Sequence, residues 1–362
     1  MTKSLTKSLT KSFDPSTSAA SELSRRGFLK TSAGAAAIGL AAGLAPFEAQ
    51  AAAGLVALVH TQAAGDNGPV DSMIAKLQQL SKEKGFATRI VYASDPATYE
   101  TIFRTLGDAG ATVVVSTFNE VGEPTKALAP TYPKTKWIQL FGDPIQPSLP
   151  NVTTVSYDYY LGCYLSGLFG ALVSKTGKLG YIGGISLPPL NADVNAIKAG
   201  ATSVNSAATL NAAFAGSFQD PAKGQEIATQ MYQGGVDYIQ TDAAATDAGI
   251  IAAANEGAGR LVSAISSAQY KLGPKTVITL VALDFGQSLY NEVARTYEAA
   301  WAGGHVATGL GTGVIDFVLS PVFQEQGPPE IVAKAKQVWP QIEKAKAAIL
   351  DGSMQVPFNT AL

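Results

Sequence analysis

Short apolar runs alternate with helical patterns along most of the chain, and this alternation restricts the possible folds more than any other feature. Gly54–His60 is a Val- and Leu-rich run of the kind that is buried on both faces of a sheet. Asp71–Gly85 follows, with apolar residues at helical spacing and a Gly at its end. Thr112–Ser116 and Lys136–Phe141 repeat the strand pattern. Strict alternation of this kind predicts parallel sheets with helices on both faces.

Asn151–Gly184 divides this series into two sets. The segment begins with an alternating run, Val152–Tyr157, continues into a helical stretch, Tyr159–Leu172, and ends in a new strand, Leu179–Gly183. Glycines spaced three to five apart in the helical stretch favour close packing between elements. They are Gly162, Gly167 and Gly170. We interpret this segment as the crossing between two lobes and expect the ligand in the cleft beneath it.

The number of βα units exceeds what one doubly wound sheet needs, and two sheets that share a hinge explain the count. The 362 residues, 46% of them hydrophobic, are sufficient for two cores. We therefore predict an α/β protein with two doubly wound parallel-sheet lobes joined by a hinge of several crossings. The expected parts are an export signal over 1–51, a first lobe over 52–157 completed by about 275–305, a second lobe over 158–270 completed by about 306–325, and a C-terminal helix and tail over 326–362.

The N-terminal segment has the pattern of a twin-arginine export signal. Arg25 and Arg26 precede an Ala- and Gly-rich apolar run, Ala33–Pro46, and Ala49–Ala51 fits a small-x-small cleavage site. A membrane anchor is the alternative, but the apolar run is shorter than the roughly 20 residues that span a bilayer. No Cys stands at the cleavage site to carry a lipid. We expect cleavage near Ala51 and a soluble periplasmic protein.

Composition argues against several classes of function. The net charge is −2, which gives no electrostatic footprint for nucleic acid. Cys163 is the single cysteine, and His60 and His305 are the two histidines, so a disulfide within the chain or a Cys/His metal site is not expected. Cys163 fits a core filler, and His60 a satisfied imidazole at a strand end. Hydrolase and nucleotide-binding motifs are missing, and we predict no catalytic residues, cofactor or metal.

The loops that leave the strands carry acids, amides and phenylalanines, with Lys, Arg and His missing from their centre. Ligands of open α/β sheets bind at the carboxyl ends of the strands. Such a lining suits a small, neutral, flat ligand, because carboxylates and amides bind its edges and Phe rings cover its faces. The side chains concerned are Asp66, Asn67, Phe118, Asn119, Asp143, Asn191, Asp193, Asn195, Phe218, Asp220, Asp242, Asp247, Asp284 and Phe285.

Several of these side chains have a structural explanation of equal or greater weight. Asp220 precedes Pro221 and fits a helix cap better than a ligand contact. Asp193 and Asp247 fit solvated loop charges as well as they fit a site. Phe218 is open between the cleft and hinge packing, and Asp143 between the cleft and a turn.

The chain also resembles the Bmp (basic membrane protein) family of ABC-importer solute-binding proteins, which includes purine- and nucleoside-binding members. The resemblance extends over nearly all of the chain after the signal. The segments that carry it are Tyr157 with Gly162 and Gly167, then Lys175–Gly184, Asn195–Ala201, Gly216–Lys223, Gly235–Ile239 and Gly352–Pro357. It implies the type I periplasmic binding fold with three hinge crossings.

The resemblance implies ligand contacts by Asp66, Asn67, Asp143, Asn195 and Phe218. Together with the strand-end pattern it gives a predicted ligand-binding set. That set is Asp66, Asn67, Phe118, Asn119, Asp143, Asn195, Phe218, Asp242 and Asp284.

Three positions depart from the nucleoside-binding pattern. Pro69–Val70 replaces a loop aromatic, Ser266–Gln269 replaces an Asp-x-Asp-Gln segment, and Leu283 stands where nucleoside binders place a Lys. Loss of the Asp and the Lys that would hold a ribose favours a free base or another small heterocycle.

These patterns together predict a monomeric periplasmic solute-binding protein, without enzymatic activity, that delivers a purine base or related compound to an ABC permease in the inner membrane. One alternative is a ligand-sensing module that docks on a receptor. The other is an exported enzyme acting on a small heterocycle, which would need a cleft residue with a perturbed pKa.

Overall fold

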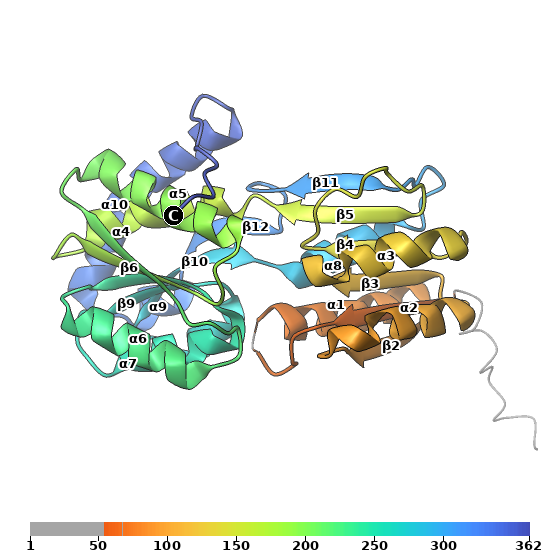
Figure 1. Cartoon of the computed structure of the whole chain (residues 1–362). Coiled ribbons are helices and arrows are strands. Elements are labelled where there is room, and N and C mark those ends of the chain that lie inside the picture. The colour runs from red at the N-terminus through yellow and green to blue at the C-terminus, as the bar shows by residue number, and fades with distance from the viewer. Residues whose placement is uncertain (1–53, 67) are drawn as a thin grey trace, which may run out of the picture. The chain divides into compact units, whose positions relative to one another are not determined.

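The computed structural model describes residues 54–66 and 68–362, and the expected export signal lies outside them. Two six-stranded sheets organise the described chain (Figure 1). The first sheet has, in spatial order, β11 (Gly304–Thr308), β5 (Val152–Tyr157), β4 (Lys136–Leu140), β3 (Val113–Thr117), β1 (Leu55–His60) and β2 (Ala87–Tyr92), all parallel. The second has β12 (Ile315–Leu319), β10 (Val277–Leu283), β9 (Leu261–Ala264), β8 (Tyr238–Asp242), β6 (Lys178–Gly183) and β7 (Thr209–Phe214). Only β12 pairs antiparallel among these strands.

Helices join the strands, as the alternating pattern predicts. The α-helices are α1 (Pro69–Lys84), α2 (Tyr99–Asp108), α3 (Gly122–Leu128), α4 (Tyr159–Val173), α5 (Pro188–Val204), α6 (Pro221–Gln233), α7 (Asp247–Asn255), α8 (Phe285–Arg295), α9 (Pro321–Gln326) and α10 (Pro329–Leu350). Short 3₁₀ turns are η2 (Pro96–Thr98), η3 (Asn119–Val121), η4 (Ala129–Thr131), η5 (Ala244–Thr246) and η6 (Ser267–Leu272). Within the described chain, no helix combines the length and apolar content needed to cross a membrane.

The chain passes between the two sheets three times. It leaves the first sheet after β5 into α4, returns from β10 into α8, and leaves again between β11 and β12. Figure 1 shows β11 beside β5, although about 150 residues separate them in the sequence. The predicted fold class, two doubly wound lobes joined by several crossings, is confirmed.

Two strands differ from the expected division of the chain. Val277–Leu283, expected in the first lobe, pairs with β9 and β12 in the second sheet. Gly304–Thr308, for which the sequence gives no strand pattern, forms the edge of the first sheet beside β5. A predominantly apolar strand is compatible with either sheet, and alternate residues of the short edge strand are exposed. Neither pattern therefore identifies the sheet to which its strand belongs.

Glycines set the contact between α4 and α5. A Cβ atom on Gly167 would lie 2.0 Å from the backbone oxygen of Ile197, and one on Gly200 would lie 2.0 Å from that of Tyr164. Both distances are far below any van der Waals contact, so only glycine permits this approach. The predicted role of the α4 glycines in close packing is confirmed, and α5 is held at one fixed distance from α4.

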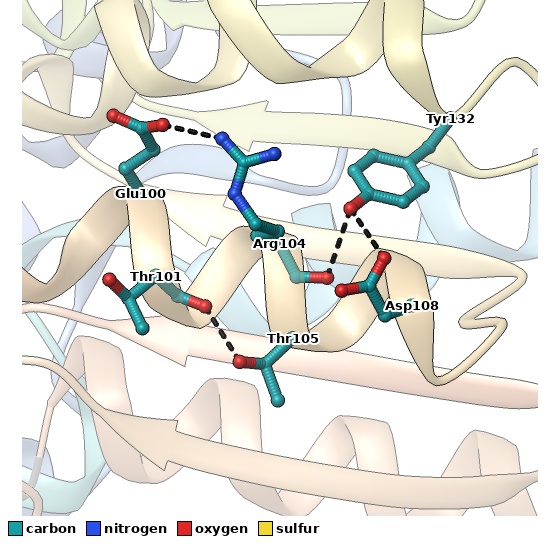
Figure 2. Close-up of polar contacts among 6 residues, drawn as sticks. All are labelled: Glu100, Thr101, Arg104, Thr105, Asp108 and Tyr132. Atoms are coloured by element: carbon teal, nitrogen blue, oxygen red, sulfur yellow. Dashed lines mark hydrogen bonds and ion pairs between the residues drawn. The ribbon is translucent and has the colours of Figure 1, made fainter.

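The outer face of α2 carries an exposed polar cluster (Figure 2). The guanidinium of Arg104 donates to the carboxylate of Glu100 one turn earlier, at 2.6 Å. The hydroxyl of Tyr132 donates to the Asp108 carboxylate at 2.7 Å and to the Arg104 carbonyl at 3.3 Å. These contacts attach the chain after η4 to the end of α2.

Candidate functional site

An aromatic cavity lies where elements of the two lobes meet. Its first wall is built from rings at the ends of first-sheet strands and at the start of α8. Phe118 and Phe141 follow β3 and β4, and Tyr157 ends β5. Phe285 packs on Tyr157 with ring centroids 4.9 Å apart, and Phe118 and Phe141 are 5.6 Å apart. Centroid spacings in this range are favourable for aromatic pairs, so the rings form one continuous apolar surface.

The second wall comes from the other lobe. Tyr159 and Tyr160 begin α4, and Phe218 follows β7. Gly184 leaves room for the Phe218 ring, because a Cβ there would lie 2.2 Å from it. The Tyr159 hydroxyl donates to the carbonyl of Val281 at 2.9 Å, which fixes its ring. The cavity volume is about 50 Å³, against roughly 30 Å³ for one water molecule in the liquid.

Backbone strain is concentrated at this cavity. Among the described residues, Phe118, Phe141 and Ala244 are the non-glycine residues with positive φ, at 69°, 56° and 51°. All three line the cavity. A positive φ is costly for bulky residues and persists where the surrounding structure enforces it, typically at functional sites. This independent observation supports the cavity as the functional site.

Two acidic side chains from the second lobe line the same cavity. Asp242 ends β8, and Asp193 lies in the first turns of α5 and is 2% exposed. Their carboxyl groups are hydrogen-bonded to each other, and the thiol of the buried Cys163 donates to Asp193. Solvated loop placement, the alternative considered for Asp193, is wrong, as it is for the fully buried Asp247.

Burial controls the protonation of the pair. Desolvation raises the pKa of Asp242 to about 7. It raises the pKa of Asp193 well above its ordinary value, and the neighbouring charge of Asp242 raises it further. Like charges this close do not both ionise readily, so Asp193 keeps its proton and donates it to Asp242. At neutral pH the pair therefore carries at most one negative charge.

Three residues of the predicted ligand set line the cavity, namely Phe118, Phe218 and Asp242. Their contact with a ligand stays a prediction. Asn67 lies outside the described residues. The other five predicted residues do not line this cavity.

Three of those five use side-chain oxygens to hold loops and helix ends, and Asp143 takes part through its backbone N–H. Asp66 is buried and accepts from the backbone N–H groups of residues 68, 70 and 71 at the start of α1. Asn119 accepts from the backbone N–H of Asp143, and both side chains are exposed. Asp284 caps α8 and accepts from the hydroxyl of Ser72 at 2.8 Å. Acids and amides at strand ends suit backbone capping as well as ligand binding, so the sequence pattern alone does not separate the two roles. Contact of these residues with a ligand stays a prediction.

Asn195 holds the C-terminal tail. Its amide nitrogen donates to the carbonyl oxygens of Asn359 and Ala361, each at 2.8 Å. This anchoring places the Phe358 ring against Tyr160, with centroids 5.1 Å apart, at the cavity. The tail thus supplies one cavity residue, which no local pattern in the sequence indicates.

Two of the three departures from the nucleoside-binding pattern lie at the cavity. Pro69 and Leu283 both line it, so the positions of the missing loop aromatic and the missing Lys face the site. Gln269 is buried, and its side-chain oxygen accepts from the backbone N–H groups of Ile265 and Ser266. Ser266 caps η6. The segment that replaces the Asp-x-Asp-Gln pattern therefore stabilises its own loop.

The expectations for Asp220 and His60 agree with the structure. The Asp220 side chain accepts from the backbone N–H of Lys223 and caps α6. His60 is buried, and its Nδ1 lies 2.7 Å from the carbonyl oxygen of Gln62. Across residues 54–66 and 68–362, no cluster of three or more His, Cys, Asp or Glu side chains is placed to hold a metal ion.

The two sheets, the three crossings and the cavity between the lobes are those of the type I periplasmic binding fold. The chain belongs to the Bmp family, since the family model, described as ABC transporter substrate-binding protein PnrA-like, matches residues 54–347. The chain is 29% identical over 285 residues to basic membrane protein A2 of Borrelia garinii subsp. bavariensis, covering 77% of this chain and 81% of that protein.

A second relative and a solved structure agree with this assignment. The chain is 26% identical over 302 residues to the ABC transporter nucleoside-binding protein BmpA of Lactococcus lactis subsp. cremoris, covering 78% of this chain and 82% of that one. A crystal structure of ABC transporter system solute-binding proteins from Aeropyrum pernix K1 superimposes with a TM-score of 0.73 at 20% identity, over 84% of this chain and 94% of that one. The last comparison concerns the fold alone.

Proposed function

We propose that this protein is the periplasmic binding component of an ABC importer and takes a flat nitrogen heterocycle, a purine base or a related compound, into the interlobe cavity. The continuous aromatic walls carry this proposal, because rings on both sides of a narrow cavity select a planar ligand. Its partner is then an ABC permease in the inner membrane, and we expect it to act as a monomer.

Binding requires the two lobes to move apart. The cavity volume of about 50 Å³ is smaller than a bicyclic heterocycle needs. The three crossings provide the hinge, and ligand contacts to both walls would shift the equilibrium from an open to a closed form.

Leu283 and Pro69 favour a base over its nucleoside. A ribose beside these apolar side chains would bury hydroxyl groups without partners, at a cost of about 1–3 kcal/mol each. We therefore expect a free purine base to bind about ten-fold or more tightly than its ribonucleoside in calorimetry. Mass spectrometry of the small molecules that co-purify would identify the class directly. Tighter binding of the nucleoside contradicts the base preference, and a bound sugar or amino acid contradicts the heterocycle proposal.

Export through the twin-arginine route is part of the proposal and depends on Arg25 and Arg26. Replacing both with lysine is expected to retain the precursor in the cytoplasm, since the paired arginines are the defining part of such a signal. Immunoblots of periplasmic and cytoplasmic fractions would measure this. Normal periplasmic yield of the double variant would contradict the route.

An exported enzyme is the second candidate, and Asp242 favours it. A cleft carboxyl whose pKa is raised to about 7 is the kind of group that acts as a general acid or base. The family relationship supports binding instead. Incubating the purified protein with purine bases and recovering them unchanged by mass spectrometry would support transport, whereas a new product would support catalysis. Docking on a receptor would use the same cavity, and neighbouring permease and ATPase genes would argue against it.

A further inference from the structure

The acid pair at the cavity has no positively charged neighbour to compensate it. Neither Lys, Arg nor His occurs among the described residues that line the cavity. The titratable groups that interact with Asp193 and Asp242 come from α4, β6 and α7, and every one of them is an acid. They are Tyr159, Cys163, Tyr181 and Asp247. A negative charge on the pair therefore has to be balanced by a proton or by the ligand.

When Asp242 is ionised, the pair holds a single carboxyl proton, and the hydrogen bond within the pair uses that proton. With Asp193 donating to Asp242, the lone pairs that remain on Asp242 can only accept. Asp193 in turn accepts from the Cys163 thiol. Ligand atoms that meet Asp242 are therefore N–H donors or centres of positive charge.

The aromatic walls favour the same kind of ligand. The faces of aromatic rings attract cations, and the attraction grows when water is excluded. Tyr157 and Phe285 on one wall and Phe218 on the other lie around the cavity that Asp242 lines. A carboxylate among aromatic rings, without a cation of its own, is the environment that organic cations require.

We propose that the cavity binds its nitrogen heterocycle as a cation, with the positive charge on the ring system opposed by the Asp242 carboxylate. This proposal rests on the proposed function and adds that the heterocycle is positively charged when it binds. It replaces the expectation of a neutral ligand, which follows from the missing basic side chains alone, with a proposal that also takes the acid pair into account. With a neutral ligand, the acid pair would either keep both of its protons or carry a negative charge that no cation balances.

A matched pair of purines tests the proposal. 9-Methyladenine is neutral, and 7,9-dimethyladeninium has the same ring with one further methyl group and a fixed positive charge. We expect the cation to bind about ten-fold or more tightly at pH 8 in calorimetry. Asp242→Asn should abolish this preference, because the amide cannot oppose the charge. Asp143→Asn removes an exposed carboxylate outside the cavity and should keep the wild-type preference.

The pH dependence separates a charge effect from a change of shape. The affinity for the fixed cation should fall as the pH decreases from 8 to 6, because Asp242, with its pKa near 7, gains a proton that the cation must displace. The Asp242→Asn variant should show no such fall. If that variant does not fold, the slope of the wild-type protein still decides the question.

Each result has one meaning. Equal or tighter binding of 9-methyladenine, or a flat pH profile in the wild-type protein, would overturn the cation proposal and leave the heterocycle function in place. Binding of neither purine at millimolar concentration would overturn the heterocycle function and, with it, the cation proposal. Preference for the cation with the expected slope supports both.

Discussion

The acids on α2 and the acids at the cavity show two ways of placing negative charge in one fold. Glu100 is 62% exposed and pairs with Arg104 at 2.6 Å, and Asp108 accepts from Tyr132 beside them (Figure 2). Asp193 is 2% exposed and shares a proton with Asp242, with only acids around it. Water and a nearby partner make the first arrangement inexpensive, whereas burial makes the second costly. A fold that retains an uncompensated buried pair at a strained cavity indicates selection for binding over stability.

The largest effect expected from this contrast is on stability as a function of pH. Asp242 titrates near 3.8 when unfolded and near 7 when folded, so the folded state holds the additional proton between these values. Its contribution to stability is complete below about pH 4 and is lost as the pH rises to about 7. At roughly 1.36 kcal/mol per pH unit, the loss is on the order of a few kcal/mol. Asp242→Asn should reduce this slope and raise the melting temperature at pH 8 above that of the wild-type protein.

Melting curves of the ligand-free protein at pH 5 and pH 8 would measure the slope. Asp247, whose pKa burial also raises to about 7, remains in the variant and should preserve part of it. Glu100→Gln on α2 is the matched control and is expected to follow the wild-type slope. If the melting temperature of Asp242→Asn changes with pH as much as that of the wild-type protein, then the cavity acids affect stability no more than the acids on α2 do.

A smaller effect is expected from the aromatic half of the site. Phe218→Ala removes stacking of about 0.5–1.5 kcal/mol together with apolar burial against a planar ligand. Affinity for the best-binding purine should fall about ten-fold or more in calorimetry. Phe358→Ala tests the tail in the same way, and its 61% exposure predicts a smaller loss. Unchanged affinity of a folded Phe218→Ala protein would place that ring in hinge packing.

The smallest effect is expected on α2 itself. Glu100→Gln breaks an exposed ion pair within one helix, and such pairs contribute little because water screens them. The melting temperature should stay within about 2 °C of the wild-type value. A larger decrease would mean that the α2 cluster of Figure 2 stabilises the first lobe more than exposure suggests.

Local patterns predict the elements of this fold better than they predict its site. The alternating run Val152–Tyr157 matches β5 residue for residue, and the helical run after it matches α4 within one residue. Elements buried on one or both faces have apolar residues at a regular spacing, so these segments can be recognised from the sequence. The edge strand β11 has only five residues, too few for such a spacing to be evident in the sequence, and is recognised by its pairing with β5.

The site depends on contacts that no local pattern contains. The sequence pattern assigns Asp193 to a loop after a strand, yet it lies in α5, and the packing of α5 on α4 turns it toward Asp242. Asn195 carries the family resemblance, but its amide is occupied by the tail. Phe141 falls at the end of a predicted strand, where its positive φ redirects the ring into the cavity. In each case tertiary structure decides the role of the residue.

The close approach of α4 and α5 at Gly167 and Gly200 separates the supporting frame of the site from its recognition surface. Backbone meets backbone at both glycines, so neither position tolerates a side chain. The positions that α4 and α5 present to the cavity, such as Tyr160 and Asp193, carry no such restriction on the backbone. A library aimed at a sensor for another solute would therefore randomise the cavity positions and keep both glycines, so that the helices hold each new set of side chains at the same spacing.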